Sequence, residues 1–288
     1  MRSLLFVPGD SPRKQEKGLE VGADALILDL EDSVALPEKG KAREIAAGFL
    51  SRMRDVAGRP RLYVRVNALD TGLTEDDLAA VMPHAPDGIM LPKAEGGPSV
   101  GQLGARLAVH EAEHGLPDGA TRILPIATET ARAVFALQSL PGASRRLSGI
   151  TWGAEDLSAD LGAETNRGED GAWTAPFVLA RNLTLMAAAA AEVDAIDTIN
   201  ALFRDLDGLA RECREARRDG FTGKMAIHPA QVAVINEAFT PTDAAIAQAR
   251  KVAAAFAEAP GMGVVGIDGE MFDRPHLRRA ERLLARLG

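Results

Sequence analysis

Cysteine is almost absent from this sequence: Cys213 is the only one among 288 residues. A lone cysteine cannot form an intramolecular disulfide, so the sequence predicts a protein of a reducing compartment such as the cytoplasm. Cys213 also lies within a predicted charged helix, far from any predicted strand end. It is therefore not expected to act as a catalytic nucleophile.

Aromatic residues and positive charge are also scarce. Phe, Trp and Tyr make up 4% of the chain, and 33 basic residues stand against 41 acidic ones, for a net charge of -8. Surfaces that bind nucleic acid carry a basic stripe, so no nucleic acid partner is expected. No apolar run reaches membrane-spanning length, and Met1 leads directly into the first predicted strand. Neither a signal peptide nor a membrane partner is expected.

What the sequence does contain is a series of short apolar runs, each too short for a helix. They occupy residues 4–8, 25–29, 62–66, 88–92, 123–127, 149–153, 194–198 and 225–229. Stretches with helical spacing of apolar residues lie between them, at 76–82, 100–114, 174–191 and 204–218. This alternation predicts parallel strands joined by crossover helices. Eight such units in 288 residues predict an α/β protein with a single (β/α)₈ TIM barrel.

The predicted barrel fills residues 1–260, which is long enough for one substantial hydrophobic core. A boundary is expected near Pro260, Gly261 and Gly263, after the eighth strand. Residues 261–288 are then a C-terminal appendage.

Polar side chains follow several of these strands at the point where each strand ends. They are Asp29, Glu31 and Asp32 after the second, Arg65 after the third, Lys93 after the fourth, Glu129 after the fifth, and Glu155 and Asp156 after the sixth. Barrel enzymes place their catalytic groups at the carboxyl ends of the strands. The sequence therefore predicts that these side chains meet at one mouth.

Two of these carboxylates are candidates for metal ligands. Glu129 and Asp156 are one βα unit apart, which puts them on adjacent strands about 5 Å apart, close enough to share a cation. Oxygen ligands without nearby His or Cys favour Mg²⁺. His110 and His114 have the i, i+4 spacing of a zinc pair, but their helix face is predicted to be solvated. Zinc is not expected there.

Each candidate also has a purely structural interpretation. Glu129 could be a carboxylate at a helix N-terminus, and Asp156 could cap a turn or helix. Several acids gathered in one mouth repel one another and need a counter-ion, which favours a metal site. Arg65 could bind neighbouring carboxylates, or it could hold a substrate carboxylate bidentately, and we favour the second role.

Ordered motifs along nearly the whole chain carry a family resemblance. They are RSLLFVPG at 2–9, LDLEDSV at 28–34, VRVN at 64–67, LPK at 91–93, ETA at 129–131, GAEDL at 153–157 and GKMAIHP at 223–229. With these motifs the sequence resembles the citrate lyase beta subunit-like branch of the HpcH/HpaI aldolase/citrate lyase superfamily, which includes malyl-CoA and citramalyl-CoA lyases.

The resemblance implies roles for the residues at the mouth. Glu129 and Asp156 would bind Mg²⁺, and Arg65 would be a catalytic residue that holds a 2-oxo acid. The resemblance further implies that the substrate contacts Gly153, Ala154 and Glu155. It also implies that the water molecules bound to the metal are held by Asp29, Glu31 and Asp32. One departure from the family pattern, the small residues Ala127 and Thr128 before Glu129, could change which oxo acid fits.

The resemblance also gives the appendage a role. The segment GEMFDRP at 269–275 resembles the family's C-terminal lid, in which an aspartate closes over the active site of a neighbouring subunit. Asp273 matches that catalytic acid. Its structural alternative is a cap before a final helix that begins near Pro275. A homotrimer or hexamer is implied.

The implied activity is Mg²⁺-dependent cleavage of a carbon-carbon bond in a 3-hydroxyacyl-CoA of the malyl-CoA or citramalyl-CoA type, giving a 2-oxo acid and an acyl-CoA. Alternatives are a malate or citramalate synthase, a malyl-CoA thioesterase, the beta subunit of a multi-component citrate lyase, and a non-catalytic module that binds oxo acids or CoA esters. Arg13, Lys14 and Lys17 could meet the phosphates of CoA, or could form the solvated face of a helix.

Overall fold

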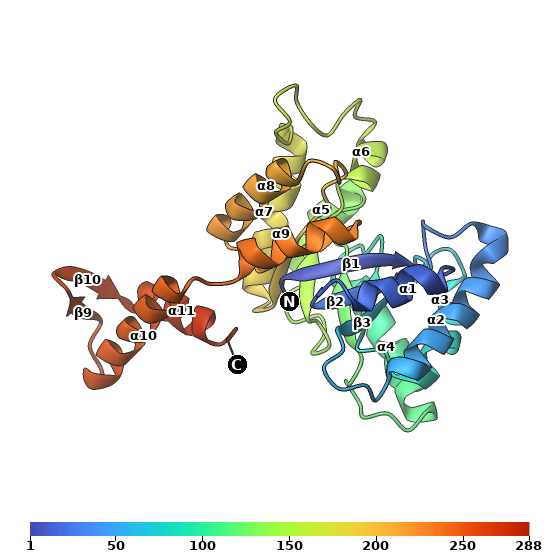
Figure 1. Cartoon of the computed structure of the whole chain (residues 1–288), viewed down its shortest axis with the longest axis horizontal. Coiled ribbons are helices and arrows are strands. Elements are labelled where there is room, and N and C mark those ends of the chain that lie inside the picture. The colour runs from blue at the N-terminus through green and yellow to red at the C-terminus, as the bar shows by residue number, and fades with distance from the viewer. Residues whose placement is uncertain (288) are drawn as a thin grey trace. The chain divides into compact units, whose positions relative to one another are not determined.

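The structure is a computed structural model that describes residues 1–287, and its elements are labelled in Figure 1. The chain forms two compact units, Met1–Phe239 and Thr240–Gly288. This division falls earlier than the boundary near residue 260 that the sequence suggested. The reason is that helix α10 (Asp243–Glu258) shares a small hydrophobic core with the segment that follows it.

Unit 1 contains all eight strands of the predicted barrel. They are β1 (Ser3–Pro8), β2 (Ala25–Asp29), β3 (Arg61–Arg65), β4 (Gly88–Leu91), β5 (Arg122–Pro125), β6 (Gly149–Thr151), β7 (Asp194–Asp197) and β8 (Gly223–Ala226). All pairings are parallel, in the order β5-β4-β3-β2-β1-β8-β7-β6. Single bridges from Ile123 to Leu147 and from Ile126 to Thr151 bring β5 to β6, so the barrel is nearly closed. The predicted fold class is confirmed.

The eighth strand begins two residues and ends three residues earlier than predicted. It ends at Ala226, because Pro229 begins helix α9 (Pro229–Phe239). Proline lacks a backbone N–H and is favoured at the first position of a helix, where that donor would have no partner.

Helices connect the strands, and all four helical stretches expected from spacing are present. The helices of unit 1 before α9 are α1 (Pro12–Leu19), α2 (Lys39–Met53), α3 (Thr74–Val81), α4 (Gly97–Glu113), α5 (Ala131–Ala136), α6 (Glu155–Leu161), α7 (Ala175–Ala190) and α8 (Leu206–Asp219), with short 3₁₀ turns η1 (Leu36–Glu38), η2 (Met82–His84) and η3 (Leu137–Ser139). Among residues 1–287, no helix combines the length and apolar character needed to cross a lipid bilayer.

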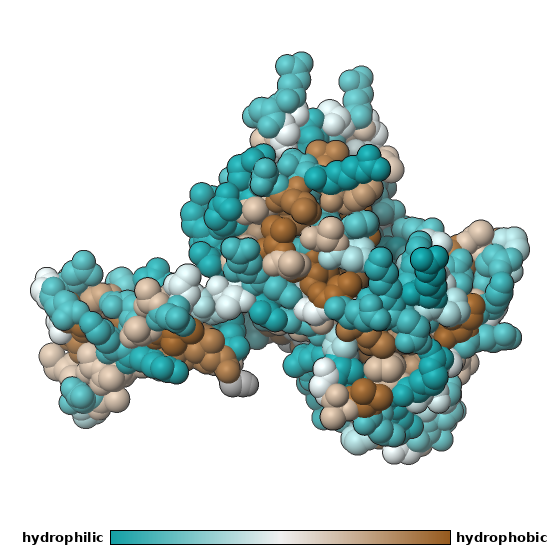
Figure 2. Space-filling model, in the orientation of Figure 1, coloured by the Kyte–Doolittle hydropathy of each residue, from teal (hydrophilic) through white to brown (hydrophobic). Residues whose placement is uncertain are grey.

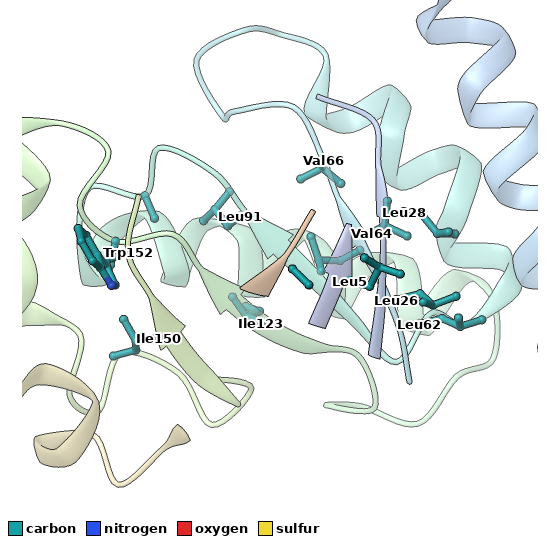
Figure 3. Close-up of a cluster of buried hydrophobic side chains, with 14 of the residues drawn as sticks. Leu5, Leu26, Leu28, Leu62, Val64, Val66, Leu91, Ile123, Ile150 and Trp152 are labelled. Atoms are coloured by element: carbon teal, nitrogen blue, oxygen red, sulfur yellow. The ribbon is translucent and has the colours of Figure 1, made fainter. Parts of the chain in front are cut away.

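Two apolar layers explain why the strands are continuously apolar. Leu26 and Leu28 on β2 point toward the helices, where they belong to the large cluster drawn in Figure 3. Ile27, between them, points into the barrel with Tyr63 and Met90. Because successive side chains of a strand face opposite ways, both layers require apolar residues.

A buried group of charges lies beside β7 and β8. Lys224 Nζ is 3.1 Å from Asp197 Oδ2, and Asp197 Oδ1 accepts hydrogen bonds from Trp152 Nε1 at 2.7 Å and Arg181 Nε at 3.3 Å. Asp197 is 2% exposed and Lys224 is fully buried. Burial disfavours the charged form of each, but their mutual attraction outweighs it and keeps the pKa of Asp197 low and that of Lys224 high.

Removing one partner should therefore destabilise unit 1. We expect Asp197→Ala to lower the free energy of unfolding by about 3–5 kcal/mol, because Lys224 keeps a buried charge with less compensation. Urea unfolding measures the change. The matched control is Glu16→Ala, which breaks an exposed ion pair with Arg52 (2.5 Å) in the same unit and should cost under about 1 kcal/mol. Equal losses in the two variants would contradict this account.

Unit 2 is built from α10, strands β9 (Val264–Ile267) and β10 (Glu270–Asp273), and helix α11 (Arg274–Leu284). The two strands form an antiparallel hairpin. Asp268 and Gly269 make its two-residue turn and both have positive φ, at 51° and 86°. An Asp-Gly pair in this conformation is typical of a type I′ turn, whose twist matches that of the strands.

The surface of the protein is mixed in polarity. Figure 2 shows apolar residues gathered near the middle of one face of unit 1, bordered by polar residues. The largest exposed fraction for a big apolar side chain is 84%, at Phe135 on α5. Isolated apolar residues at a surface are normal in monomeric proteins, so they identify no site by themselves.

Candidate active site

A cavity of about 680 Å³ opens at the carboxyl ends of the barrel strands. Most of the predicted site residues of unit 1 line it: Asp29, Asp32, Arg65, Glu129, Gly153, Ala154, Glu155 and Asp156. Glu31 joins them through its ion pairs. The structure thus brings the predicted residues together at one mouth, while the role of each stays a prediction.

Strand pairing places Arg65 beside Asp29. The two residues end β3 and β2 and lie opposite each other in the register. Arg65 donates from Nε to Asp29 Oδ1 and from Nη2 to Asp29 Oδ2, both at 2.7 Å. Its Nη1 lies 2.9 Å from Glu31 Oε2. This is the alternative weighed from sequence, in which Arg65 binds neighbouring carboxylates, and it fixes the plane of the guanidinium.

Asp29 and Glu31 respond differently to this environment. Burial disfavours the ionised form of both carboxyl groups. For Asp29 the hydrogen bonds and charge of Arg65 outweigh burial, and its pKa is lowered. For Glu31 burial prevails over Arg65 and Lys93, and its pKa is raised. Asp29 is therefore ionised beside Arg65, whereas additional positive charge would stabilise the ionised form of Glu31.

Glu129 is the most strongly perturbed carboxyl group in the cavity. It is 3% exposed, and its Oε2 accepts a hydrogen bond from the backbone N–H of Lys93. Burial raises the pKa of Glu129 to about 8, the nearby Asp156 and Glu31 carboxylates add to the effect, and the Lys93 N–H opposes it. A nearby cation would relieve this penalty.

Neither acid caps a helix through its side chain. Thr130 caps α5, accepting a hydrogen bond from the N–H of Ala133 at 3.1 Å, so Glu129 does not cap that helix. Asp156 lies in the first turn of α6, which has no side-chain cap. Gly153 packs so closely that a Cβ there would lie 2.7 Å from Glu129 Cγ. A glycine is therefore required beside Glu129.

Lys93 is a site residue to which the sequence gave no role. Its Nζ is 2.6 Å from Glu31 Oε1 and 3.4 Å from Asp156 Oδ1, so one ammonium bridges two acids. Burial opposes its charge, but Glu31 outweighs burial and raises the pKa of Lys93. Its backbone has a φ of 49°, in the left-handed region. The LPK motif at the end of β4 was the available signal.

The donor set suits a hard divalent cation. Glu129 and Asp156 offer carboxylate oxygens, and no cysteine lines the cavity. His228 lines it, but its ring stacks on Phe203 with centroids 4.9 Å apart. Oxygen ligands with room for further oxygens are typical of Mg²⁺ sites. The residues present therefore fit this metal.

Comparison with known proteins now identifies the family. A model of the HpcH/HpaI aldolase/citrate lyase family matches residues 2–229, and a model described as a C-C bond lyase of the TIM-barrel fold matches residues 177–287. The chain belongs to the HpcH/HpaI aldolase/citrate lyase family. The resemblance stated from the sequence motifs is confirmed.

The names of the curated relatives describe several different activities. The citrate lyase subunit beta of Leuconostoc mesenteroides is 36% identical, over 98% of this chain and 92% of that protein. The mitochondrial citramalyl-CoA lyase of Rattus norvegicus is 33% identical, over 98% and 85%. A (3S)-malyl-CoA thioesterase of Cereibacter sphaeroides is 36% identical, over 99% and 94%. The family thus includes CoA-ester lyases and a thioesterase.

A solved structure extends the comparison to ligands. CitE of Mycobacterium tuberculosis, in complex with magnesium, acetoacetate and coenzyme A, superposes with a TM-score of 0.76 at 35% identity. The match covers 99% of this chain and 97% of CitE. Family membership therefore rests on structure as well as sequence.

Asp273 belongs to unit 2, where it caps α11. It accepts a hydrogen bond from the backbone N–H of His276, and its Oδ1 lies 2.5 Å from His276 Nδ1. The hydrogen bond from the His276 side chain lowers the pKa of Asp273. The cap predicted as the structural alternative is thus present. Asn is nearly as good a helix cap as Asp, so substitution can separate capping from chemistry.

Proposed function

We propose that this protein is a Mg²⁺-dependent lyase that cleaves a 3-hydroxyacyl-CoA of the malyl-CoA or citramalyl-CoA type to a 2-oxo acid and an acyl-CoA. The observation that carries the proposal is the pair Glu129 and Asp156 in the barrel cavity, beside Arg65. Family membership and the magnesium, acetoacetate and coenzyme A in the CitE structure support it. We place the enzyme in the cytoplasm, as a homotrimer or hexamer.

Glu129 and Asp156 would hold the metal. Bound there, Mg²⁺ supplies positive charge that stabilises the negative charge developing on the substrate hydroxyl oxygen. Glu129 must be ionised to bind the metal. Asp29, Glu31 and Asp32 add negative charge at the same mouth. Gly153, Ala154 and Glu155 form the adjoining wall against which the substrate would lie.

Arg65 would hold the carboxylate of the oxo-acid portion. Asp29 already orients the guanidinium through two hydrogen bonds, and Nη1 is directed toward Glu31 and Asp32. A base takes the proton of the substrate hydroxyl, whose oxygen becomes the carbonyl oxygen of the 2-oxo acid as the bond between the second and third carbons breaks. The electron pair of that bond passes to the acyl fragment as an enolate. Asp273 would protonate that carbon, or remove the proton in the condensation direction. We propose that unit 2 acts as a lid on a neighbouring subunit.

Magnesium affinity should depend on pH. The pKa of about 8 means that Glu129 is largely protonated at pH 7 in the metal-free protein, and the cation must displace that proton. We expect affinity to rise up to roughly tenfold per pH unit until about pH 8 and then level off. Calorimetry in two buffers of different ionisation enthalpy measures the released proton. A constant affinity between about pH 6 and pH 8 would count against the assignment.

The same group makes the metal-free protein less stable as pH rises. The folded-state pKa of Glu129 lies above the ordinary 4.5, so the folded protein holds this proton more tightly than the unfolded chain. The stabilisation is complete below about pH 4.5 and is lost as pH rises through about 8. Mg²⁺ should reverse the loss at the upper end of this window.

Lys93→Met should make stability more dependent on magnesium. The substitution removes the ammonium that bridges Glu31 and Asp156, leaving the acids of the cavity uncompensated. We expect the metal-free Tm to fall by about 3–6 °C, and Mg²⁺ to raise it more than in the wild type. Lys41→Met, at an exposed lysine, is the control for differential scanning fluorimetry. Equal magnesium shifts in both variants would show that Lys93 does not balance these carboxylates.

A substrate panel tests the proposed reaction directly. Malyl-CoA, citramalyl-CoA and β-methylmalyl-CoA are assayed with and without Mg²⁺, and the 2-oxo acid and the free thiol are measured separately. Magnesium-dependent oxo acid without free thiol is the expected result. Free thiol without oxo acid would instead select the thioesterase named among the relatives.

The remaining alternatives are separated by adding two further assays to the panel, one with acetyl-CoA and an oxo acid and one with a thioester on an acyl carrier protein. Product formed by condensing acetyl-CoA with the oxo acid, with release of thiol, would select a synthase. Turnover only of a thioester on an acyl carrier protein would select a citrate lyase beta subunit. A shift in Tm with CoA esters but no turnover of any substrate would leave only a binding module.

A further inference from the structure

Three of the five histidines of the chain gather outside the active-site cavity, at η2 and the C-terminal end of α4. His110 and Glu113 on α4 and His114 directly after it each offer a ligand atom, and these atoms lie within 4.8 Å of one another. His84 is the last residue of η2, which packs against α4. None of the three histidines lines the cavity.

The structure changes the expectation for His110. The sequence predicted a solvated helix face, but His110 is 6% exposed because this part of α4 packs near α3. Its Nε2 lies 2.9 Å from Glu75 Oε1 on α3. The other oxygen of Glu75 is 3.9 Å from Arg106 Nη1 on α4. Glu75 is thus held between two groups of the neighbouring helix.

The contact with Glu75 determines which nitrogen of His110 is available. An ionised carboxylate only accepts hydrogen bonds, so Nε2 carries the proton in the neutral ring and Nδ1 carries the free lone pair. Nδ1 is buried and has no hydrogen-bond partner within residues 1–287. Its nearest acid, Glu113 Oε2, is 3.8 Å away, beyond hydrogen-bond length. A buried acceptor without a partner is costly and calls for an explanation.

We propose that His110 Nδ1, Glu113 and His114 form a second metal site, for a borderline transition ion such as Zn²⁺ or Co²⁺. Residues at i, i+3 and i+4 share one face of a helix. A carboxylate behind a histidine, as Glu75 is here, is the usual device that orients a metal-binding ring. Zinc sites take three protein ligands with a fourth position for water or another side chain, and His84 is the nearby candidate.

The ligand types separate this site from the cavity. Two imidazoles and one carboxylate suit Zn²⁺ or Co²⁺, whereas carboxylates alone suit Mg²⁺. Glu113 at the end of α4 and His114 just after it are exposed, so their side chains can rotate until ligand atoms that already lie within 4.8 Å of one another reach bonding distance of one ion. His110, the buried member, already has its Nδ1 without a hydrogen-bond partner within residues 1–287.

The site resembles a hydrolytic zinc motif in sequence but not in structure. Residues 110–114 read HEAEH, and in H-E-x-x-H metalloproteases the first glutamate is the general base. Here that residue, Glu111, is buried and pairs with Arg146 through two contacts of 2.7 Å. It also accepts hydrogen bonds from the backbone N–H groups of Gly119 and Thr121. Glu111 cannot activate a water, so the ion would tie α4 to α3 and η2 instead of catalysing a reaction.

The test is a Co²⁺ and Zn²⁺ titration of the full-length protein in saturating Mg²⁺, which fills carboxylate sites. Co²⁺ reports its ligands through its visible absorption, and Zn²⁺ should displace it at one ion per chain and raise Tm. We expect His114→Ala to weaken Zn²⁺ binding at least about tenfold without changing substrate turnover. Glu215→Gln, at an exposed acid on α8, is the control and should bind like the wild type.

Glu75 provides a second variant that does not remove a ligand. Glu75→Gln keeps an acceptor for the Nε2 proton of His110, whereas Glu75→Leu removes it, so Leu should weaken binding more than Gln, by roughly 10–100-fold relative to the wild type. Unchanged Zn²⁺ binding in His114→Ala would overturn the proposal. So would binding that is lost in Asp156→Asn but kept in His114→Ala, because the ion would then occupy the cavity.

Discussion

Glu129→Gln should lower kcat/KM by about 1000-fold or more, because the metal it would hold contributes several kcal/mol to the transition state and each 1.4 kcal/mol is a factor of ten. Gln keeps the size of the side chain and an oxygen that can accept the hydrogen bond from the Lys93 N–H. It removes only the charge. Steady-state kinetics across a Mg²⁺ titration measures the effect, and Asp156→Asn should behave in the same way.

The stability of this variant distinguishes loss of the metal from loss of the fold. Ionised Glu129 is disfavoured by burial, so the neutral amide should leave the metal-free Tm unchanged or slightly higher near pH 8. Magnesium should no longer raise Tm. Glu237→Gln, at an exposed acid on α9, is the matched control and should retain activity. Full turnover by Glu129→Gln would refute the metal assignment.

Asp273→Asn should lower kcat by about 100-fold to 10,000-fold, the range expected when a positioned acid or base is lost. Asn keeps the cap of α11, so circular dichroism and Tm should be unchanged. If Asp273 were only a helix cap, activity would be retained. The observed cap geometry makes this substitution a cleaner test than Asp273→Ala, which would remove both roles.

Subunit mixing tests whether the lid acts between chains. Arg65→Ala and Asp273→Asn are each expected to be inactive alone. If one chain supplies Arg65 and its neighbour supplies Asp273, co-expression should restore roughly a quarter of the wild-type activity, as random assembly around a closed ring predicts. No recovery from chains that co-purify as one oligomer would place both residues in the same chain.

The positions of the catalytic candidates could be predicted because they depend on periodicity and strand order. Alternating strand and helix signals predicted a parallel barrel, and a parallel barrel brings the carboxyl ends of all strands to one rim. Glu129 and Asp156 follow neighbouring strands, so their positions along the chain were enough to predict them as a pair. Both line the cavity.

The contacts of single side chains could not be predicted in this way. Lys93 follows β4, but its bridge between Glu31 and Asp156 depends on its own backbone conformation. Its φ lies in the left-handed region, which turns the chain at this point. Its own N–H thereby reaches Glu129. Arg65 was expected to face a substrate, a role that stays a prediction, and the register of β2 and β3 places it in contact with Asp29. Such contacts depend on distances of a few Å between segments far apart in sequence.

The sequence by itself determined the barrel, the rim that carries the acids, and the family, because these follow from patterns that repeat along the chain. Only the tertiary structure decided the protonation state of each group and whether its atoms are free to bind a ligand. Burial and neighbouring charges raise the pKa of Glu129 to about 8, and packing near α3 buries His110 with an unpartnered nitrogen. Solvation and electrostatic coupling depend on what surrounds a side chain in space, which the order of residues along the chain does not specify.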